Sequence, residues 1–231
     1  TLESSSAASD VYKRQDHYAT ASLCGPNSKK ILKKIIPDLD LSDENFPHMS
    51  FKESKIGNIQ CRIMRISFTG EHSYEINVQA SYGKDLWEKC IEAGKEFNIT
   101  PYGTETMHLL RAEKGFIIVG QDTDGTMTPI DLQMDWIVSK KKYDFIGKRS
   151  LYRSDTMRED RKQLVGLLTE DPNEVLEEGA QIVSELNQSP VEMLGHVTSS
   201  YFSPNLKKSI ALAVVRGCLL YTSDAADELS S

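Results

Sequence analysis

Alternating hydrophobic and polar residues predict that the patterned part of the chain starts with a strand and a helix. The alternation covers residues 17–24 and ends at a Gly-Pro pair. The next segment, 27–39, places apolar residues on one helical face, and Asn27 or Ser28 can serve as its N-cap. The apolar residues are Ile31, Leu32, Ile35 and Ile36.

A β-hairpin and two helices are predicted next. Residues 59–80 alternate on both sides of a central Thr-Gly-Glu-His turn, and Ile, Tyr and Val occupy the arms. Segments 81–99 and 104–115 have apolar residues at spacings of three and four, which predicts two amphipathic helices. Thr104 is the expected cap of the second helix, and Gly115 is expected to end it in the left-handed conformation.

The pattern changes from helical to strand-like after residue 125. Residues 128–138 predict a strand, and the basic, glycine-punctuated segment 139–151 indicates a domain boundary near residue 150. Short strands separated by proline and glycine follow, which is typical of a small antiparallel barrel or sandwich. These strands are predicted over 163–170, 179–185, 193–201 and 207–215.

The predicted fold class is therefore α+β, followed by a small antiparallel β-barrel. We expect one domain over residues 16–150 and an all-β domain over 151–217. The ends, 1–15 and 218–231, lack apolar periodicity and resemble translated adapter sequence, so we interpret them as a non-native leader and tail. Genuine disordered tails are the alternative interpretation.

Composition and charge argue against several classes of protein, such as nucleic-acid-binding and membrane-spanning proteins. A net charge of −7 and a pI near 5.3 disfavour non-specific nucleic-acid binding, which needs a basic surface. No apolar run approaches the roughly 20 residues that cross a bilayer. The cysteines form no C-x-x-C pair, so neither a zinc site nor a disulfide framework is indicated, and a reducing cytoplasm fits best.

The segment GQDTDGTMTPID, residues 120–131, has some features of a calcium loop. Asp122, Asp124 and Asp131 stand at ligand positions of that loop. However, Gly120 offers no carboxylate at the first position and Pro129 interrupts the return arm. We therefore favour a turn in which aspartates accept hydrogen bonds from backbone N–H groups. The histidines are scattered, so no metal site is predicted from them either.

Glu113 stands at a helix end where a carboxylate needs an explanation. A carboxylate on the last turn of a helix opposes the macrodipole, at a cost of about 0.3–1 kcal/mol. Arg111 is two positions away and therefore points to another side of the helix. A flat heterocycle with adjacent N–H donors would explain a carboxylate here. From spacing alone, an exposed glutamate at a capped helix end, leading into a buried strand over 116–119, is the simpler interpretation.

A set of ordered motifs adds to this interpretation: RISFTGEHSYEINV, YGTETMHLLRAEKGF, GQDTDGTMTPIDLQMDW, FIGKRSL, LGHVTSSYFSP and SIALAVV. Together they resemble the glycine-cleavage T-protein (aminomethyltransferase) family. The stretches RAEKGFIIVGQDTDGTMTPID, VSKKKYDFIGKRSL and REDRKQLVGLLTEDP are similar to the C-terminal region of the alpha subunit of heterotetrameric sarcosine oxidase. The resemblance covers residues 17–216 and reverses the preference for an exposed Glu113.

The resemblance implies an aminomethyltransferase-like folate-binding fold, truncated at its N-terminus, with tetrahydrofolate as cofactor. Glu113 of the R-x-E-x-G motif would bind the pterin ring, with Arg111 in the same motif. Tyr74 matches the aromatic position of the hairpin motif, although cross-strand packing is the alternative. Lys142 stands where aminomethyltransferases carry an arginine near the folate tail, and lysine lacks arginine's bidentate fork.

The implied activity is one-carbon transfer coupled to oxidative demethylation of sarcosine, which yields methylenetetrahydrofolate and glycine. FMN, FAD and NAD would be held elsewhere in the complex, and the beta, gamma and delta subunits would be partners. The family's catalytic acid would lie upstream of this chain, so we expect a fragment that is inactive alone. A stand-alone glycine-cleavage T-protein and a non-catalytic folate-binding or assembly module remain as alternatives.

Overall fold

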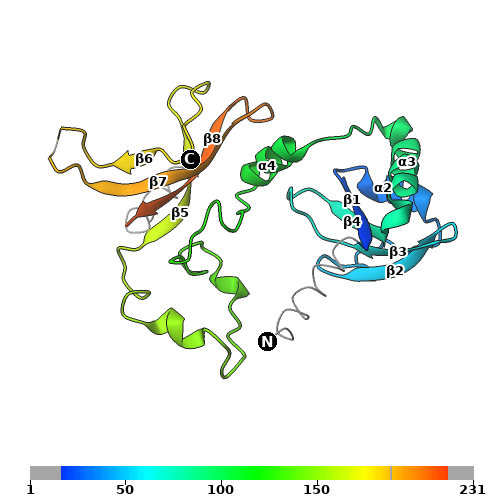
Figure 1. The fold of residues 1–231 in the computed structure, drawn as a ribbon, viewed down its shortest axis with the longest axis horizontal. Coiled ribbons are helices and arrows are strands. Elements are labelled where there is room, and N and C mark those ends of the chain that lie inside the picture. Colours follow the sequence, from blue (N-terminus) through cyan, green and yellow to red (C-terminus); the bar gives the residue numbers. More distant parts are fainter. Residues whose placement is uncertain (1–16, 188, 218–231) are drawn as a thin grey trace, which may run out of the picture. The chain divides into compact units, whose positions relative to one another are not determined.

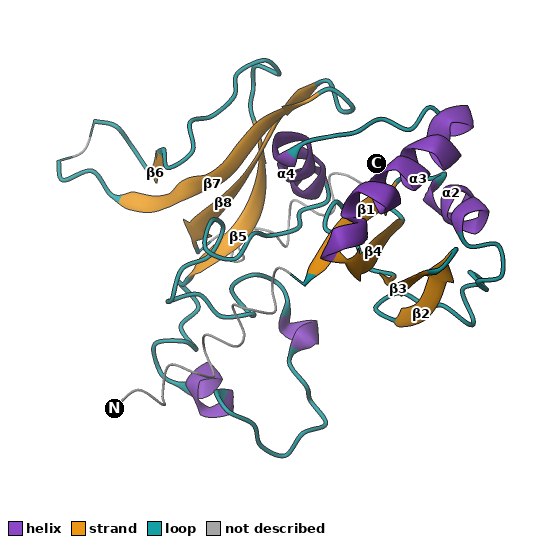
Figure 2. Ribbon diagram, turned by 45° about the vertical axis from the view of Figure 1, so that its right-hand side comes forward, coloured by secondary structure: helices purple, strands orange, loops and turns teal. Residues whose placement is uncertain are grey.

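The computed structural model describes residues 17–187 and 189–217. The chain forms two compact units that divide between Met107 and His108, and each unit is described by itself. Figures 1 and 2 show the two antiparallel sheets around which they are built. The predicted leader and tail, 1–15 and 218–231, lie outside the described residues.

The first unit is a four-stranded antiparallel sheet with two helices. The order across the sheet is β1-β4-β3-β2. The strands are β1 (Tyr18–Cys24), β2 (Phe51–Ile56), β3 (Ile59–Met64) and β4 (Ser73–Gln79), and the helices are α2 (Ser28–Ile35) and α3 (Gly83–Gly94). The predicted first strand, the hairpin of β3 and β4, and both helices are confirmed. β2 was not anticipated.

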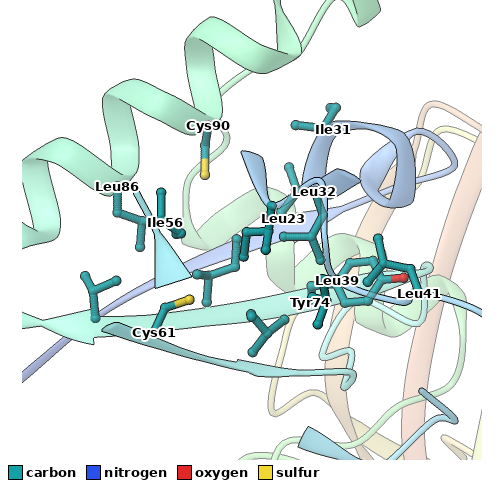
Figure 3. Packing of buried hydrophobic residues seen from close by; sticks show 14 of the residues in the cluster. Leu23, Ile31, Leu32, Leu39, Leu41, Ile56, Cys61, Tyr74, Leu86 and Cys90 are labelled. Atoms are coloured by element: carbon teal, nitrogen blue, oxygen red, sulfur yellow. The ribbon is translucent and has the colours of Figure 1, made fainter. Parts of the chain in front are cut away.

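The core of the first unit lies between the sheet and its helices. Leu86 and Cys90 of α3 point towards the strands, where Leu23 of β1 and Cys61 of β3 meet them (Figure 3). This arrangement follows from the two periodicities, because one face of each helix and alternate residues of β1, β3 and β4 are apolar. The helix residue Leu32 is fully buried in the same cluster.

Helix α4 (Thr104–Glu113) lies where the sequence predicts a helix, but Thr104 is its first residue and not its cap, since the Met107 N–H bonds to the Gly103 carbonyl at 3.2 Å. Gly115 has φ +70°, so it takes the left-handed conformation expected at a helix end. The N–H of Phe116 returns to the carbonyl of Arg111 at 2.9 Å, and that of Gly115 to Ala112 at 3.0 Å. These bonds satisfy carbonyls that the last helical turn leaves unpaired.

Two predicted strands after α4 are wrong. Residues 116–118 have no regular secondary structure, a turn begins at Val119, and Val119 is 83% exposed. Residues 128–138 form turns and a 3-10 helix, Asp135–Ile137. Their backbone groups bond locally, as when Met134 N–H donates to the Pro129 carbonyl at 2.8 Å, so their apolar composition did not require a sheet partner.

The second unit contains the other antiparallel sheet, with the order β5-β8-β7-β6. All four strands predicted after residue 150 are present. They are β5 (Lys162–Leu168), β6 (Gln181–Val183), β7 (Met193–Ser203) and β8 (Lys208–Arg216). The predicted domain boundary near residue 150 lies inside this unit, within a 3-10 helix at Lys148–Tyr152. Among the described residues, no helix has the length and apolar character needed to span a membrane.

Candidate functional site

The end of α4 is tied to β7 by a buried ionic network. Arg111 donates through Nη1 to Oδ2 of Asp122 at 2.5 Å, and neither side chain is exposed. Its Nη2 donates to the hydroxyl of Ser199 at 2.7 Å, and Nη1 also donates to the Phe116 carbonyl at 3.0 Å. One buried guanidinium therefore stabilises the turn that follows α4, through hydrogen bonds to Phe116 and Asp122.

Asp122 accepts further hydrogen bonds that keep it ionised. Burial alone raises the pKa of this carboxyl, but donors from Ile118 N–H, Thr198 and Ser199, together with the Arg111 charge, bring its pKa below the usual value. The Ile118 N–H lies 2.8 Å from Oδ2, and the hydroxyls of Thr198 and Ser199 lie 2.6 and 2.7 Å from Oδ1. These donors stabilise the charged carboxylate and thereby offset the cost of burying it.

Glu113 leaves α4 in a different direction from Arg111. Its Oε1 accepts from the Ser203 hydroxyl at 2.5 Å, and Asn205 Nδ2 lies 3.1 Å from Oε2 and 3.3 Å from Oε1. The same Ser203 oxygen accepts from the Leu206 N–H at 3.0 Å. Glu113 therefore fixes the turn between β7 and β8 while its carboxylate is only partly buried.

Glu113 also lines a cavity of about 600 Å³ in the second unit. Apolar side chains of β5, β8 and neighbouring loops line it together with polar backbone groups, and these side chains include Leu132, Leu164, Leu167, Leu168, Leu206, Ile210 and Leu212. Lys114 and Gln133 add polar groups. The cavity thus combines apolar side chains with polar backbone and side-chain groups, and a carboxylate there can accept paired N–H donors of a small molecule.

The other predicted ligand contacts lie in different surroundings. Arg111 is fully buried, and its guanidinium N–H groups donate to Asp122 and Ser199. In this structure Arg111 therefore positions the helix end that carries Glu113. Tyr74, in the first unit, is also fully buried. Its hydroxyl lies 3.0 Å from His72 Nε2 and its ring centroid 5.8 Å from that of Phe46. Direct ligand contact by Tyr74 or Arg111 stays a prediction.

Lys142 lies on an exposed loop of the second unit. Its N–H donates to the Ser139 hydroxyl at 3.3 Å, and its carbonyl accepts from Lys148 Nζ at 3.4 Å. It lines a separate cavity of about 360 Å³ together with Ile137 and Phe145. A contact between Lys142 and an anionic ligand tail stays a prediction.

The predicted aspartate turn over 120–131 is confirmed. Asp124 accepts from the Thr126 N–H at 2.8 Å, and Asp131 accepts from the Thr128 N–H at 2.7 Å. Asp131 is also paired with Arg161, at 2.7 Å. Within the described residues, no cluster of three or more His, Cys, Asp or Glu side chains could hold a metal ion.

Sequence reasoning missed Ser203 and Asn205 as partners of Glu113. A Ser-Pro-Asn run is a turn signal, and it stands where the predicted strands 193–201 and 207–215 are separated. That signal locates the turn. It does not indicate that the turn meets the end of a helix about 90 residues earlier, since such a contact depends on the tertiary fold.

Two family models match the chain. The GCVT N-terminal domain matches residues 1–142, and the glycine cleavage T-protein C-terminal barrel domain matches residues 162–229. The chain belongs to the glycine-cleavage T-protein family. The predicted domain boundary near residue 150 falls between the two matched ranges, and the domain limits themselves stay a prediction.

Curated relatives of this T-protein family chain include sarcosine oxidase alpha subunits and aminomethyltransferases. Sarcosine oxidase subunit alpha from Corynebacterium sp. (strain P-1) is 50% identical over 205 residues, which are 87% of this chain and 21% of that protein. The same subunit from Rhizobium meliloti (strain 1021) is 40% identical over 87% of this chain and 20% of that protein. Aminomethyltransferase from Thermoanaerobacter sp. (strain X514) is 35% identical over 89% of this chain and 54% of that protein.

The chain thus spans about a fifth of the sarcosine oxidase subunits and about half of the aminomethyltransferases that it matches. A solved structure, aminomethyltransferase T of the glycine cleavage system from Bartonella henselae, has the same fold, with a TM-score of 0.71. It is 24% identical, and the match covers 86% of this chain and 52% of that one. The predicted resemblance and the aminomethyltransferase-like fold are confirmed.

Proposed function

We propose that this T-protein family chain is the tetrahydrofolate-binding part of a sarcosine oxidase alpha subunit. In the proposed reaction the folate accepts the one-carbon unit released by oxidative demethylation of sarcosine, giving methylenetetrahydrofolate and glycine. The 40% and 50% identities to sarcosine oxidase alpha subunits support this assignment. The flavins and NAD, the beta, gamma and delta subunits, and a cytoplasmic location belong to the same proposal.

The observation that carries the proposal is the position of Glu113 on a cavity of about 600 Å³ that apolar side chains and polar groups line together. The pterin ring is flat and has adjacent ring N–H and amino donors, which match the two oxygens of one carboxylate. Apolar walls favour the faces of such a ring, and a charged acceptor selects its polar edge. Glu113 is therefore the proposed pterin ligand, and Arg111 and Ser203 are proposed to position it.

The contacts of Glu113 make the proposal more specific. Ser203 engages only Oε1, whereas Asn205 reaches both oxygens at longer distances. A carboxylate has about four lone-pair directions, so the Ser203 bond can persist while the ligand uses the positions that the exposed Asn205 amide now shares. Binding is then expected to replace the Asn205 contacts and to keep the Ser203 contact.

The test is tetrahydrofolate binding and product formation by the protein with its upstream half and partner subunits restored. Glu113→Gln retains the shape of the side chain but presents an amide donor to a ligand donor. Folate affinity is expected to fall at least about tenfold, equivalent to about 1.4 kcal/mol. Calorimetric titration gives the affinity, and thermal unfolding without ligand should show little change.

Two control variants separate binding from folding. Asn205→Ala removes the competing amide, so folate affinity should stay equal or rise. Ser203→Ala removes two hydrogen bonds of the turn and should lower thermal stability. Equal affinity in Glu113→Gln, together with lower stability, would assign Glu113 a purely structural role. Folate binding without turnover of sarcosine by the restored assembly would favour a non-catalytic folate-binding module.

A further inference from the structure

A second cavity of the second unit, of about 210 Å³, is lined mainly by charged side chains. Cations outnumber carboxylates in its wall, although the chain as a whole has a formal net charge of −7. The cations are Arg158, Arg161, Lys162 and Arg216, and the carboxylates are Asp124 and Asp160. This cavity shares no lining residue with the one that Glu113 lines, so its function is a separate question.

The second sheet places two of these cations directly opposite each other. Lys162 is the first residue of β5 and Arg216 is the last of β8, and the two are partners in the antiparallel register. His196 of β7 is paired with Val214, which lies two residues before Arg216 and therefore on the same face. Opposed side chains have Cβ atoms about 4.5–5.5 Å apart, and opposed like charges destabilise a sheet. The unliganded chain therefore carries a local repulsion here.

The two carboxylates in the wall already have donors of their own. Asp160 accepts from Nε of Arg158 at 2.8 Å and from its Nη2 at 2.5 Å. Asp124 accepts from the N–H of Thr126 at 2.8 Å and from its hydroxyl at 2.6 Å. The opposed cations of the sheet therefore act on these carboxylates through longer-range attraction and not through hydrogen bonds.

Arg161 is also occupied by other parts of the chain. Its Nε and Nη2 lie 2.8 and 2.7 Å from the two oxygens of Asp131, and Nη2 also donates to the Thr126 carbonyl at 2.6 Å. In the described part of the chain, neither Lys162 nor Arg216 forms an ion pair or a side-chain hydrogen bond. The cavity thus has two opposed cations whose N–H donors are available to a ligand.

We propose that Lys162 and Arg216 bind the phosphate group of a small ligand. A phosphate group carries a charge of about −1.5 to −2 at pH 7 and three acceptor oxygens, so it can neutralise both cations, whereas one carboxylate can neutralise only one. Arginine supplies a fork of N–H donors and lysine a point charge. The imidazole of His196 and the hydroxyl of Thr126 line the same cavity and can add donors.

This inference goes beyond the proposed folate function and does not depend on it. The volume of about 210 Å³ also fits a small anion better than a large cofactor, since sites for drug-sized ligands usually measure about 300–1,000 Å³. Either free phosphate or a phosphate monoester could supply the group, because both present the same oxygens to the two cations.

Calorimetric titration of the 231-residue chain with inorganic phosphate tests the proposal, with ionic strength held constant by sodium chloride. Saturable binding with a dissociation constant of about 1 mM or lower is expected. Tighter binding of glycerol phosphate than of inorganic phosphate would identify a monoester as the ligand, and the reverse would identify free phosphate. Acetate and malonate should bind at least tenfold more weakly than phosphate. Equal or tighter binding of either carboxylate would overturn the proposal.

Three variants of matched charge complete the experiment. Lys162→Gln and Arg216→Gln should each weaken phosphate binding at least tenfold, and the melting temperature without ligand should stay equal or rise because the opposed like charges are gone. Lys208→Gln removes the same charge from the other end of β8, where it does not line the cavity, and should bind phosphate as the native chain does. If one cavity variant does not fold, the other decides. Equal affinity in all three variants, or no saturable binding by the native chain, would overturn the proposal.

The acidic residues that follow β8 in the sequence require a last control. Asp224, Asp227 and Glu228 come shortly after Arg216. Their joint replacement by Asn, Asn and Gln should leave the affinity for phosphate unchanged. A gain of tenfold or more would show that these carboxylates compete for the two cations as the native occupant, and it would overturn the proposal.

Discussion

Nη1 of Arg111 lies 2.5 Å from Oδ2 of Asp122, and both side chains are completely excluded from solvent. A helix end and a following turn are thereby joined to β7 through Ser199, which contacts both members of the pair. Removing one member of a buried pair leaves the other as an uncompensated charge, which is much costlier than the pair itself is stabilising.

Arg111→Met should therefore lower the free energy of unfolding by about 3–5 kcal/mol, measured by urea denaturation. The double variant Arg111→Met with Asp122→Leu should recover part of that loss, because no unpaired charge remains. Arg158→Met is a matched control, since it breaks an exposed arginine–aspartate pair and should change stability little. A small effect of Arg111→Met alone would contradict the role assigned to the network.

Acid should destabilise the fold through the same carboxylate. Burial by itself raises the pKa of Asp122, but its hydrogen bonds and Arg111 lower the folded-state pKa below the value of about 3.9 in an unfolded chain. The stabilisation that ionised Asp122 gives the folded state is therefore complete above about pH 3.9, and it is lost as the pH falls through the lower folded-state pKa. Unfolding free energies from about pH 6 to about pH 2.5 should decline more steeply in the native chain than in Asp122→Asn.

Gly195 should not tolerate alanine. A Cβ at this position of β7 would lie 1.9 Å from the carbonyl oxygen of Val214 and 2.9 Å from Cα of Val215, both in the paired strand β8. Backbone atoms cannot move aside as a side chain can. Gly195→Ala should therefore lower the free energy of unfolding by at least the roughly 1–3 kcal/mol that is typical of overpacking. Gly166→Ala on β5 is the control, because its Cβ would meet no atom within 4 Å. Equal melting temperatures for the two variants would contradict this account.

Two cysteines should resist alkylation in the folded chain. Burial raises the pKa of Cys61 to about 11, and burial raises the pKa of Cys90 to about 11 as well. At about pH 8 only about one such thiol in a thousand is the reactive thiolate. Iodoacetamide followed by peptide mass spectrometry should find both unmodified in the native state and modified in denaturant. Rapid labelling of either cysteine in the native state would show that the surrounding core becomes exposed to solvent, contrary to this prediction.

Local periodicity was sufficient to predict much of the fold. The strand at 17–24, the hairpin of β3 and β4, α3, α4 and the four strands of the second sheet were all predicted from residues that are neighbours in sequence. β2 escaped because FKESKI has apolar residues only at its two ends. The predicted strand at 128–138 failed because local turns satisfied a segment whose apolar content suggested a sheet.

The candidate site was less predictable, for a physical reason. Glu113 was identified through its motif, but the residues that orient it and Arg111 are Ser203 and Ser199, which come from the far end of the chain. A serine in a predicted strand carries no sign of which helix end it will meet. The partner is determined by tertiary contacts, and a pattern of neighbouring residues contains no information about them.

The shared carboxylate of Glu113 has a consequence for selectivity in the proposed site. A ligand must displace the Asn205 amide, which now spans both carboxylate oxygens. A molecule with a single donor would break these contacts and restore only part of them, whereas one with two adjacent donors would replace them in full. In the proposed site the β7–β8 turn would therefore compete with the ligand and disfavour molecules with a single donor, such as alcohols, before any steric limit applies.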